Sequence, residues 1–296
     1  MSDDARACRF APQHSSAMDK PSKNPSNNKP DIVYDSLADN YESWIEESAG
    51  LKIIYSTFHD AVDDNKARLK GRVLDLGCGI GIFTRILSNV EGVTGVVGLD
   101  ISRESVLHAK GKCNDRCSFL AGSATELPFP DSSFDAVVAL GDTISHIHNG
   151  YREAISEAGR ILKPGGHLLF DVDNKWNLGL LSEPRELKAA IQTIPSGHIR
   201  EWSFLDAFGD QCSLNFKTFR PSEIIGLLNG AGLSVLDFHG LIILPNIIPQ
   251  RFHYNYSTEK PLSRAVMALS RLDKVIHKLP FFRGLGIGAM IVARKR

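Results

Sequence analysis

The 296-residue sequence has few cysteines, no long uncharged apolar run and a formal net charge of zero. Its five cysteines predict no disulfide framework, and Cys113 and Cys117 are too isolated for a zinc site, which usually needs four clustered ligands. Because no run of 18 uncharged apolar residues and no apolar leader is present, neither a membrane span nor secretion is expected. These absences favour a cytoplasmic protein, and the hydrophobic content of 43% is ordinary for a globular fold.

The zero net charge conceals a basic C-terminal end. Residues 251–296 hold ten Lys or Arg and two acids, so they carry +8, and residues 1–250 must carry −8. Within this end, residues 261–279 combine an apolar stripe of helical spacing with four basic residues. The stripe consists of Leu262, Val266, Leu269, Leu272, Ile276 and Leu279. Two interpretations stay open: the helix rests on an anionic membrane surface, or it packs on the core while its charges face water.

The most informative segment is a glycine-dense turn at residues 77–81. The apolar run before it contains Asp75, and a helical pattern starts at Ile82. A strand, a glycine turn and a helix in this order let a nucleotide-like ligand lie against bare backbone. The dinucleotide fingerprint G-x-G-x-x-G would need glycine where Ile82 stands. An acid at position 75 instead suits a ligand with a positively charged amino-acid end.

A second acid follows at the tip of the next apolar run. Residues 96–100 read Val-Val-Gly-Leu-Asp, so Asp100 ends the run nineteen residues past Gly81 (100 − 81). An acid at the end of the second strand is well placed to accept hydrogen bonds from two ribose hydroxyls. The two features together predict an adenosine derivative as the ligand.

At these residues, and again at 122–135 and 162–168, the chain resembles the class I S-adenosylmethionine-dependent methyltransferases, whose first motif is D-x-G-x-G-x-G. It is similar to small-molecule members of the ubiquinone/menaquinone biosynthesis type, over roughly residues 70 to 240. The resemblance implies S-adenosylmethionine as the cofactor and no metal. The cofactor-binding residues that it implies are Asp75, Gly77, Cys78, Gly79, Asp100, Ile101, Ser123, Ala124, Leu140, Gly141 and Tyr41. Many relatives carry Asp where Ser123 stands, so the adenine contact falls to Ser123 or to the backbone of Ala124.

Alternating strand and helix patterns predict an α/β fold with a Rossmann-like, doubly wound sheet. The resemblance adds seven strands, mostly parallel with an antiparallel last strand, and lid insertions. Strands are expected at 72–76, 94–100, 118–121, 134–140, 167–172, 233–238 and 286–294, and helices at 102–112 and 151–162. The expected domains are a disordered tail at 1–30, a helical cap at 31–70 and a methyltransferase domain at 71–296, with irregular substrate-side insertions at about 175–218 and 241–285.

The acceptor should approach over the end of the strand at 134–140, beside residues 141–148. His146 is the candidate general base, because imidazole titrates near neutral pH. The alternative is that His146 contacts the cofactor carboxylate. Residues 140–146 also resemble the small-amine N-methyltransferases similar to glycine N-methyltransferase.

The expected function is transfer of a methyl group by in-line displacement to a small, hydrophobic acceptor such as a lipid or a quinone precursor. The alternatives are an RNA methyltransferase that holds phosphates with its basic end, a small-amine N-methyltransferase, and a non-catalytic member that acts through a partner. Nucleic acid is disfavoured, because no compact module interleaves aromatic and basic residues and no Asn/Asp-Pro-Pro-aromatic motif is present. Peripheral contact with a membrane is expected only under the first interpretation of the basic helix. The sequence makes no prediction of the oligomeric state.

Overall fold

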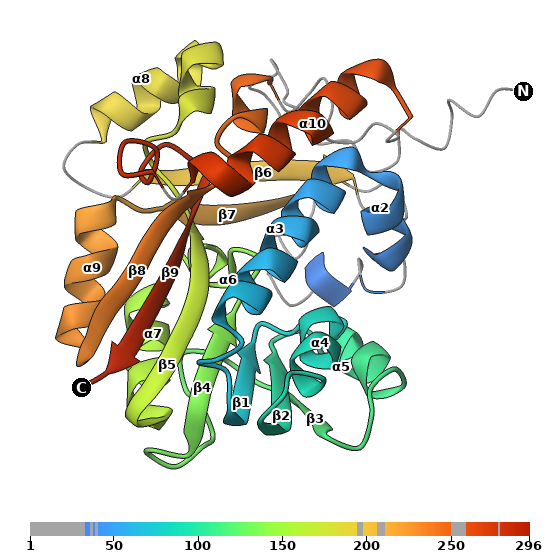
Figure 1. Ribbon diagram of the computed structural model, residues 1–296, viewed down its shortest axis with the longest axis vertical. Helices are drawn as coiled ribbons and strands as arrows, with labels where there is room; N and C mark the ends of the chain where they lie inside the picture. Colours follow the sequence, from blue (N-terminus) through green and yellow to red (C-terminus); the bar gives the residue numbers. More distant parts are fainter. Residues whose placement is uncertain are drawn as a thin grey trace, which may run out of the picture.

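A computed structural model describes residues 33–35, 38, 41–193, 198–205, 211–249, 259–277 and 279–296. Its centre is a seven-stranded sheet in the order β3-β2-β1-β4-β5-β9-β8, and β9 runs antiparallel to both of its neighbours (Figure 1). The strands are β1 Gly71–Leu76, β2 Val93–Asp100, β3 Cys117–Ala121, β4 Phe134–Ala139, β5 Leu162–Asp173, β8 Leu233–Leu241 and β9 Gly288–Lys295. The predicted fold class is confirmed, while the expected tail at 1–30 lies outside the described residues.

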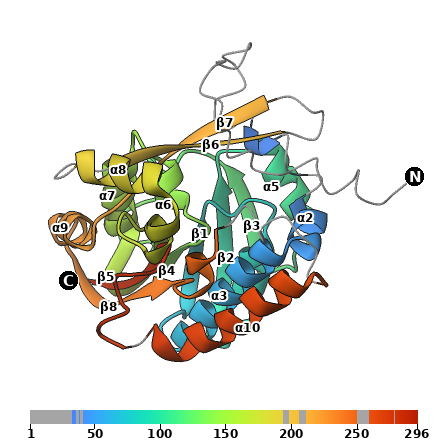
Figure 2. The ribbon, with the colours of Figure 1, turned by 90° about the horizontal axis from the view of Figure 1, so that it is seen from above.

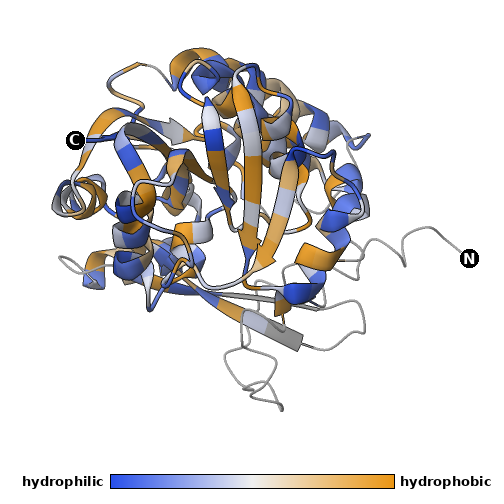
Figure 3. Cartoon of the chain, turned by 90° about the horizontal axis from the view of Figure 1, so that it is seen from below, coloured by the Kyte–Doolittle hydropathy of each residue, from blue (hydrophilic) through white to orange (hydrophobic). Residues whose placement is uncertain are grey.

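Both faces of this sheet are covered, as a parallel sheet requires. Successive residues of a strand point to opposite faces, so Val137 packs with the helices of one side and Val138 with those of the other. One side holds α7 Tyr151–Ile161 and α9 Pro221–Gly230, and the other holds α3 Ala49–Asn65 and α4 Ile82–Ser88. Hydrophobic residues accordingly run along the central strands (Figure 3).

The start of β5 differs from the prediction. Helix α7 ends at Ile161 and the strand begins at Leu162, whereas the expected strand began only at residue 167. The Pro-Gly-Gly segment at 164–166 lies within the strand, where Gly165 has φ +79° and the pairing with β4 shifts register. The glycines therefore bend the strand instead of separating it from the helix.

The insertion at 175–218 was expected to be irregular, and this prediction was wrong. It contains a 3-10 turn at Leu178–Ser182, α8 Pro184–Gln192, and the antiparallel pair β6 His198–Leu205 and β7 Gln211–Thr218. Figures 1 and 2 show this pair lying across the end of the sheet beside α6 Thr143–His146. The strands were missed because they pair with each other and belong to no repeating strand–helix unit.

The second insertion, 241–285, contains η5 Pro245–Ile247 and α10 Pro261–Ile276. Helix α10 lies along α3 at the edge of the molecule, where Lys274 Nζ is 2.6 Å from Asp60 Oδ2 (Figure 2). The predicted apolar stripe is divided between two faces, because Val266 is buried while Leu262 and Leu272 are exposed. Among the described residues, no helix combines the length and the hydropathy needed to cross a membrane.

One disulfide corrects the expectation drawn from the cysteines. Cys113 and Cys117 are bonded across the turn that joins α5 Arg103–Lys110 to β3. The turn brings their Cα atoms to 6.0 Å, a separation that a disulfide can span. Cys78 is free and buried.

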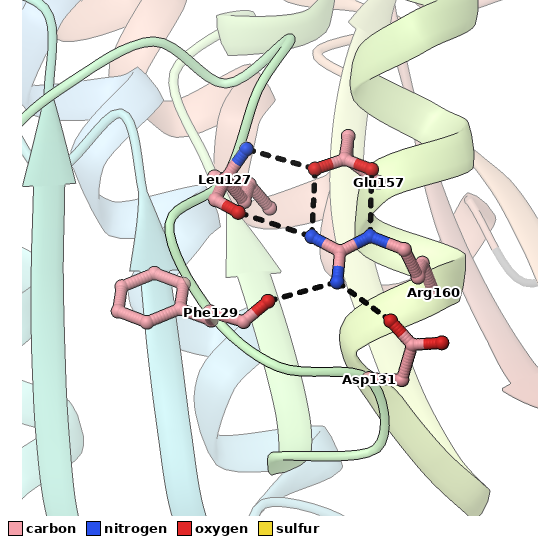
Figure 4. A network of polar contacts seen from close by, with 5 residues as sticks. All are labelled: Leu127, Phe129, Asp131, Glu157 and Arg160. Carbon is pink, nitrogen blue, oxygen red and sulfur yellow. Dashed lines mark hydrogen bonds and ion pairs between the residues drawn. The ribbon is translucent and has the colours of Figure 1, made fainter.

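Arg160 on α7 holds the loop that leads into β4 (Figure 4). Its guanidinium donates to the carbonyl oxygens of Leu127 and Phe129, and it pairs with Glu157 and Asp131 at 2.7–2.8 Å. Glu157 in turn accepts the backbone N–H of Leu127 at 2.8 Å. The planar fork of one arginine thus fixes a loop containing two prolines, which have no N–H of their own to donate.

Candidate functional site

A cavity of about 460 Å³ lies at the carboxyl ends of the parallel strands, where α/β sheets bind their ligands. It is enclosed on the other side by the N-terminal helices, by β7 and by the segment after β8. Most residues that the sequence singled out line it. These are Tyr41, Gly77, Cys78, Gly79, Asp100, Ile101, Ser123, Ala124, Leu140, Gly141 and His146.

The glycine turn forms the floor of the cavity. Gly77, Gly79 and Gly81 have φ of +77°, +49° and +80°, a region that side chains rarely tolerate. A Cβ on Gly77 would lie 2.4 Å from the Oγ1 atom of Thr143, whereas a Cβ on Gly79 would meet nothing within 4 Å. Gly77 is therefore required both by its positive φ and by its close approach to Thr143. Gly79 instead leaves open space above its backbone.

Asp100 stands at the tip of β2 beside this turn. Its Oδ2 accepts the Gly79 N–H at 2.7 Å, and its Oδ1 accepts the Ser102 N–H at 2.9 Å. Each oxygen keeps a second lone pair, which a hydroxyl in the cavity can use. Burial raises the pKa of Asp100, while the backbone N–H donors oppose this rise.

Asp75 does not line the cavity. It is 2% exposed beneath the floor, where its Oδ2 accepts the hydroxyl of Thr84 at 2.6 Å. Burial raises its pKa to about 7. Asp75 therefore braces β1 against α4 from below, and we do not assign it a direct contact with a ligand.

The adenine side of the cavity was expected at Ser123 and Ala124, and both residues line it. The Ser123 hydroxyl is 2.7 Å from that of Thr125 and also accepts the Thr125 backbone N–H. Ile101, 49% exposed, presents an apolar surface beside Asp100. This part of the lining thus combines an apolar surface with one hydroxyl, groups that suit a heterocycle.

Four further acids line the cavity and were not predicted as site residues, and one of them is Glu201 on β6. Asp171 and Asp173 come from the end of β5, and Asp142 follows β4. Asp171 accepts the N–H groups of Gly141 and Asp142 at 2.9 and 3.2 Å. Burial, followed by the charge of Asp142, raises the pKa of both Asp171 and Asp173. The strand-end argument that found Asp100 would have found the two acids of β5 as well.

His146 faces this acidic region from α6. Its ring lies edge-on to Tyr34, with centroids 6.0 Å apart, and 5.9 Å from the ring of Phe216 on β7. Its buried Nδ1 atom has no hydrogen-bond partner among the described residues. Burial lowers the pKa of His146, so the ring is neutral at pH 7 and has a nitrogen available to a ligand.

Arg200 adds the only charge of opposite sign among the described lining residues. It lies over the Phe216 ring, 5.5 Å from the centroid, and its Nε is 2.9 Å from Glu186 Oε2 on α8. The cavity thus combines bare backbone on one side with aromatic rings, acids and one imidazole on the other.

The residues present fit S-adenosylmethionine. Gly79 leaves open space above its backbone, Asp100 offers two acceptor oxygens for ribose hydroxyls, and the acids of β5 and residue 142 suit a cationic amino-acid end. The cofactor of the resemblance and the cavity therefore agree on chemical grounds.

Comparison with known proteins supports the same assignment. Residues 73–166 match a family described as a methyltransferase domain. The chain is 35% identical over 131 residues to the 27-O-demethylrifamycin SV methyltransferase of Amycolatopsis mediterranei, which covers 42% of this chain and 47% of that protein. It is 34% identical over 158 residues to the ubiquinone/menaquinone biosynthesis C-methyltransferase UbiE of Pseudomonas aeruginosa, which covers 51% of this chain and 60% of that one. The chain thus spans about half the length of these curated relatives.

A solved structure extends the likeness of the fold over nearly the whole chain. The [4+2]-cyclase SpnF has a TM-score of 0.56 and 19% identity, covering 93% of this chain and 99% of that one. At this identity the likeness concerns the fold alone, and SpnF is named for a cyclisation. The fold therefore does not indicate which reaction this chain catalyses.

Proposed function

Through residues 73–166 this chain belongs to the class I S-adenosylmethionine-dependent methyltransferases, and we propose that it methylates a small, hydrophobic acceptor, such as a lipid or a quinone precursor. The observation that carries the proposal is the cavity, whose glycine floor and Asp100 lie opposite a wall of aromatic and apolar side chains. When bound, S-adenosylmethionine supplies a methyl group already activated by a sulfonium.

On the cofactor side, we propose that Asp100 accepts the ribose hydroxyls and that Gly77 and Gly79 admit the ligand to the backbone. Ser123, Ala124 and Ile101 are proposed to enclose the adenine. The remaining proposed contacts come from Cys78, Leu140, Gly141 and Tyr41, which line the same cavity. These residues hold the cofactor and need no proton transfer.

On the acceptor side, the lining consists mainly of rings and aliphatic chains. They are Tyr34, Leu51, Ile54, Tyr55, Phe58, Phe83, Phe216, Leu241 and Ile242. Such a wall favours an apolar acceptor and excludes water from the transfer. The two relatives above, named for a rifamycin precursor and for quinone biosynthesis, support the same class of acceptor.

We propose that His146 accepts the proton when the methylated atom carries one. Because burial keeps its pKa low, the imidazole is neutral at pH 7, and its unpartnered Nδ1 is free to accept a hydrogen bond. Tyr34 and Phe216 hold the ring between them. Proton removal and alignment are then the two tasks left to the chain.

A second candidate, methylation of a small amine, is favoured by one observation. Asp142 and Asp173 line the cavity together with aromatic rings, and acids and rings are groups that bind ammonium ions. The same acids also suit the cationic end of the cofactor, so they are weaker evidence for an amine acceptor. The apolar wall is stronger evidence for a hydrophobic acceptor. RNA remains disfavoured, and we propose a cytoplasmic enzyme that contacts membranes only peripherally.

The proposal is tested with the full chain, S-adenosylmethionine labelled on its methyl group, and a cell extract separated into lipid, RNA, protein and polar metabolite fractions. We expect label in the lipid fraction. Label in the polar fraction would support the amine instead, and label in RNA would overturn both. If no fraction takes label although the protein binds S-adenosylhomocysteine, it is not a methyltransferase of any of these acceptors.

A further inference from the structure

Helix α10 presents an apolar surface to solvent. Its outward face carries Leu262, Ala265, Ala268, Leu272 and Val275, spaced three or four residues apart, so that they form one stripe along the helix. Leu272 and Val275 are 55% and 69% exposed. Beyond the end of the helix two further apolar side chains are exposed, Leu279 by 47% and Phe281 by 79%. These seven residues are called the α10 stripe below.

The charges beside the stripe are of one sign. Arg264 and Arg271 lie two turns apart on one edge of it, both are exposed, and neither forms an ion pair with another described residue. From residue 260 to 283 the single acid is Asp273. Asp273 is buried and points inward, and Asp60 of the neighbouring α3 is paired with Lys274. No acid of α10 therefore offsets the basic edge.

The same helix is joined to the wall of the cavity. The two oxygens of Asp273 accept the backbone N–H groups of Ile243 and Leu244 at 2.8 and 3.0 Å. The residue before them, Ile242, lines the cavity and has φ +54°, which is unusual for a β-branched side chain. Two hydrogen bonds of Asp273 thus connect α10 to the segment that forms part of the apolar side of the cavity.

We infer that the α10 stripe and its basic edge form a docking surface for an anionic lipid bilayer. The apolar residues lie at the depth of the headgroups while Arg264 and Arg271 meet lipid phosphates. Docked in this way, the protein holds the cavity wall at Ile242 close to the bilayer, from which an apolar acceptor enters. The docking stands on the surface itself, and only its purpose rests on the proposed function.

The test is sedimentation of the full chain with vesicles of phosphatidylcholine, with and without phosphatidylglycerol, in the absence of cofactor. We expect binding only to the anionic vesicles. The variant Leu272→Ser/Val275→Ser should bind anionic vesicles at least about tenfold more weakly. The variant Arg264→Gln/Arg271→Gln should also bind weakly, and its remaining binding should not depend on the salt concentration. The control Leu107→Ser removes a side chain of similar exposure, 50%, on α5 and should bind like the wild type.

Phe281→Trp offers a direct readout, since its emission should shift to shorter wavelength on anionic vesicles. The inference is overturned if the wild type does not bind them, if Leu272→Ser/Val275→Ser binds equally well, or if a dimer in solution covers the stripe. Binding to RNA in place of vesicles would also overturn it. Because none of the substituted residues lines the cavity, these variants should bind S-adenosylhomocysteine normally by calorimetry, which distinguishes a failure of docking from a failure of the proposed methyl transfer.

Discussion

The two walls of the cavity are built from different parts of the chain. The proposed cofactor side is mainly backbone, a glycine turn and the ends of β2 and β4 within residues 77–141, with Tyr41 of α2 Tyr41–Glu47 beside it. The proposed acceptor side is made mostly of side chains from α3, from β7 and from the segment after β8, which are far apart in sequence. The proposed cofactor side thus lies in the segment that carries the sequence motifs. The proposed acceptor side lies in segments without such motifs.

The largest expected effect concerns the backbone side. If Asp100 accepts both ribose hydroxyls as proposed, Asp100→Ala removes two charge-assisted hydrogen bonds to the ligand, each contributing about 1.5–3 kcal/mol, so affinity for S-adenosylhomocysteine should fall at least about 100-fold by calorimetry. The control Asp115→Ala changes an exposed acid just before β3, at the end of the sheet away from Asp100, and should bind normally. Equal affinity in Asp100→Ala would end the ribose assignment.

On the acceptor side, His146→Gln should leave the affinity for S-adenosylhomocysteine unchanged. It should slow methyl transfer to the extract fraction that takes up label about 100-fold, because a proton acceptor is lost. The lowered pKa of His146 adds a pH dependence: the wild-type rate should be constant above pH 7 and fall in acid as the ring becomes protonated. A variant that loses cofactor affinity instead would place His146 on the cofactor side.

The loop that leads into β4 is probed at Arg160. Arg160→Leu leaves Glu157 and two carbonyl oxygens without their donor, and it should lower the free energy of unfolding by about 2 kcal/mol, measured by chemical denaturation. Arg152→Leu on the same helix is exposed and should change it little. If the two variants are equally stable, the network of Figure 4 contributes nothing measurable.

A smaller effect is expected at Gly77. In Gly77→Ala the new Cβ meets Thr143 at a positive φ, so affinity for S-adenosylhomocysteine should fall about tenfold, with a loss of stability of roughly 1 kcal/mol or more. Gly226→Ala has open space on the exposed face of α9 and should instead stabilise the helix by about 0.5–1 kcal/mol. Normal binding by Gly77→Ala would show that the floor can deform.

How far the sequence predicted the structure follows the same division. The first four strands, β1 to β4, were placed within one residue at each end, as at 72–76 against the observed β1, because continuous apolar runs and glycine turns are local signals. The β6–β7 pair was missed, because its strands pair only with each other. Asp75 was expected to contact the ligand, yet burial beneath the floor turned it toward Thr84, and no local pattern reports such depth.

The same holds for the acceptor side. Tyr34 and Phe216 meet at His146 although 182 residues separate them (216 − 34), and that contact exists only in the folded chain. Which residues of α10 are exposed likewise depends on the face that lies against α3. The helical spacing alone therefore left both membrane contact and packing on the core open.

The most direct measurement is a crystal structure of the full chain with S-adenosylhomocysteine. The division of the cavity predicts the ligand over the turn at 77–81, with both ribose hydroxyls within hydrogen-bond distance of Asp100 and the sulfur directed toward His146 and Phe216. A ligand bound elsewhere, or one whose ribose does not reach Asp100, would contradict it.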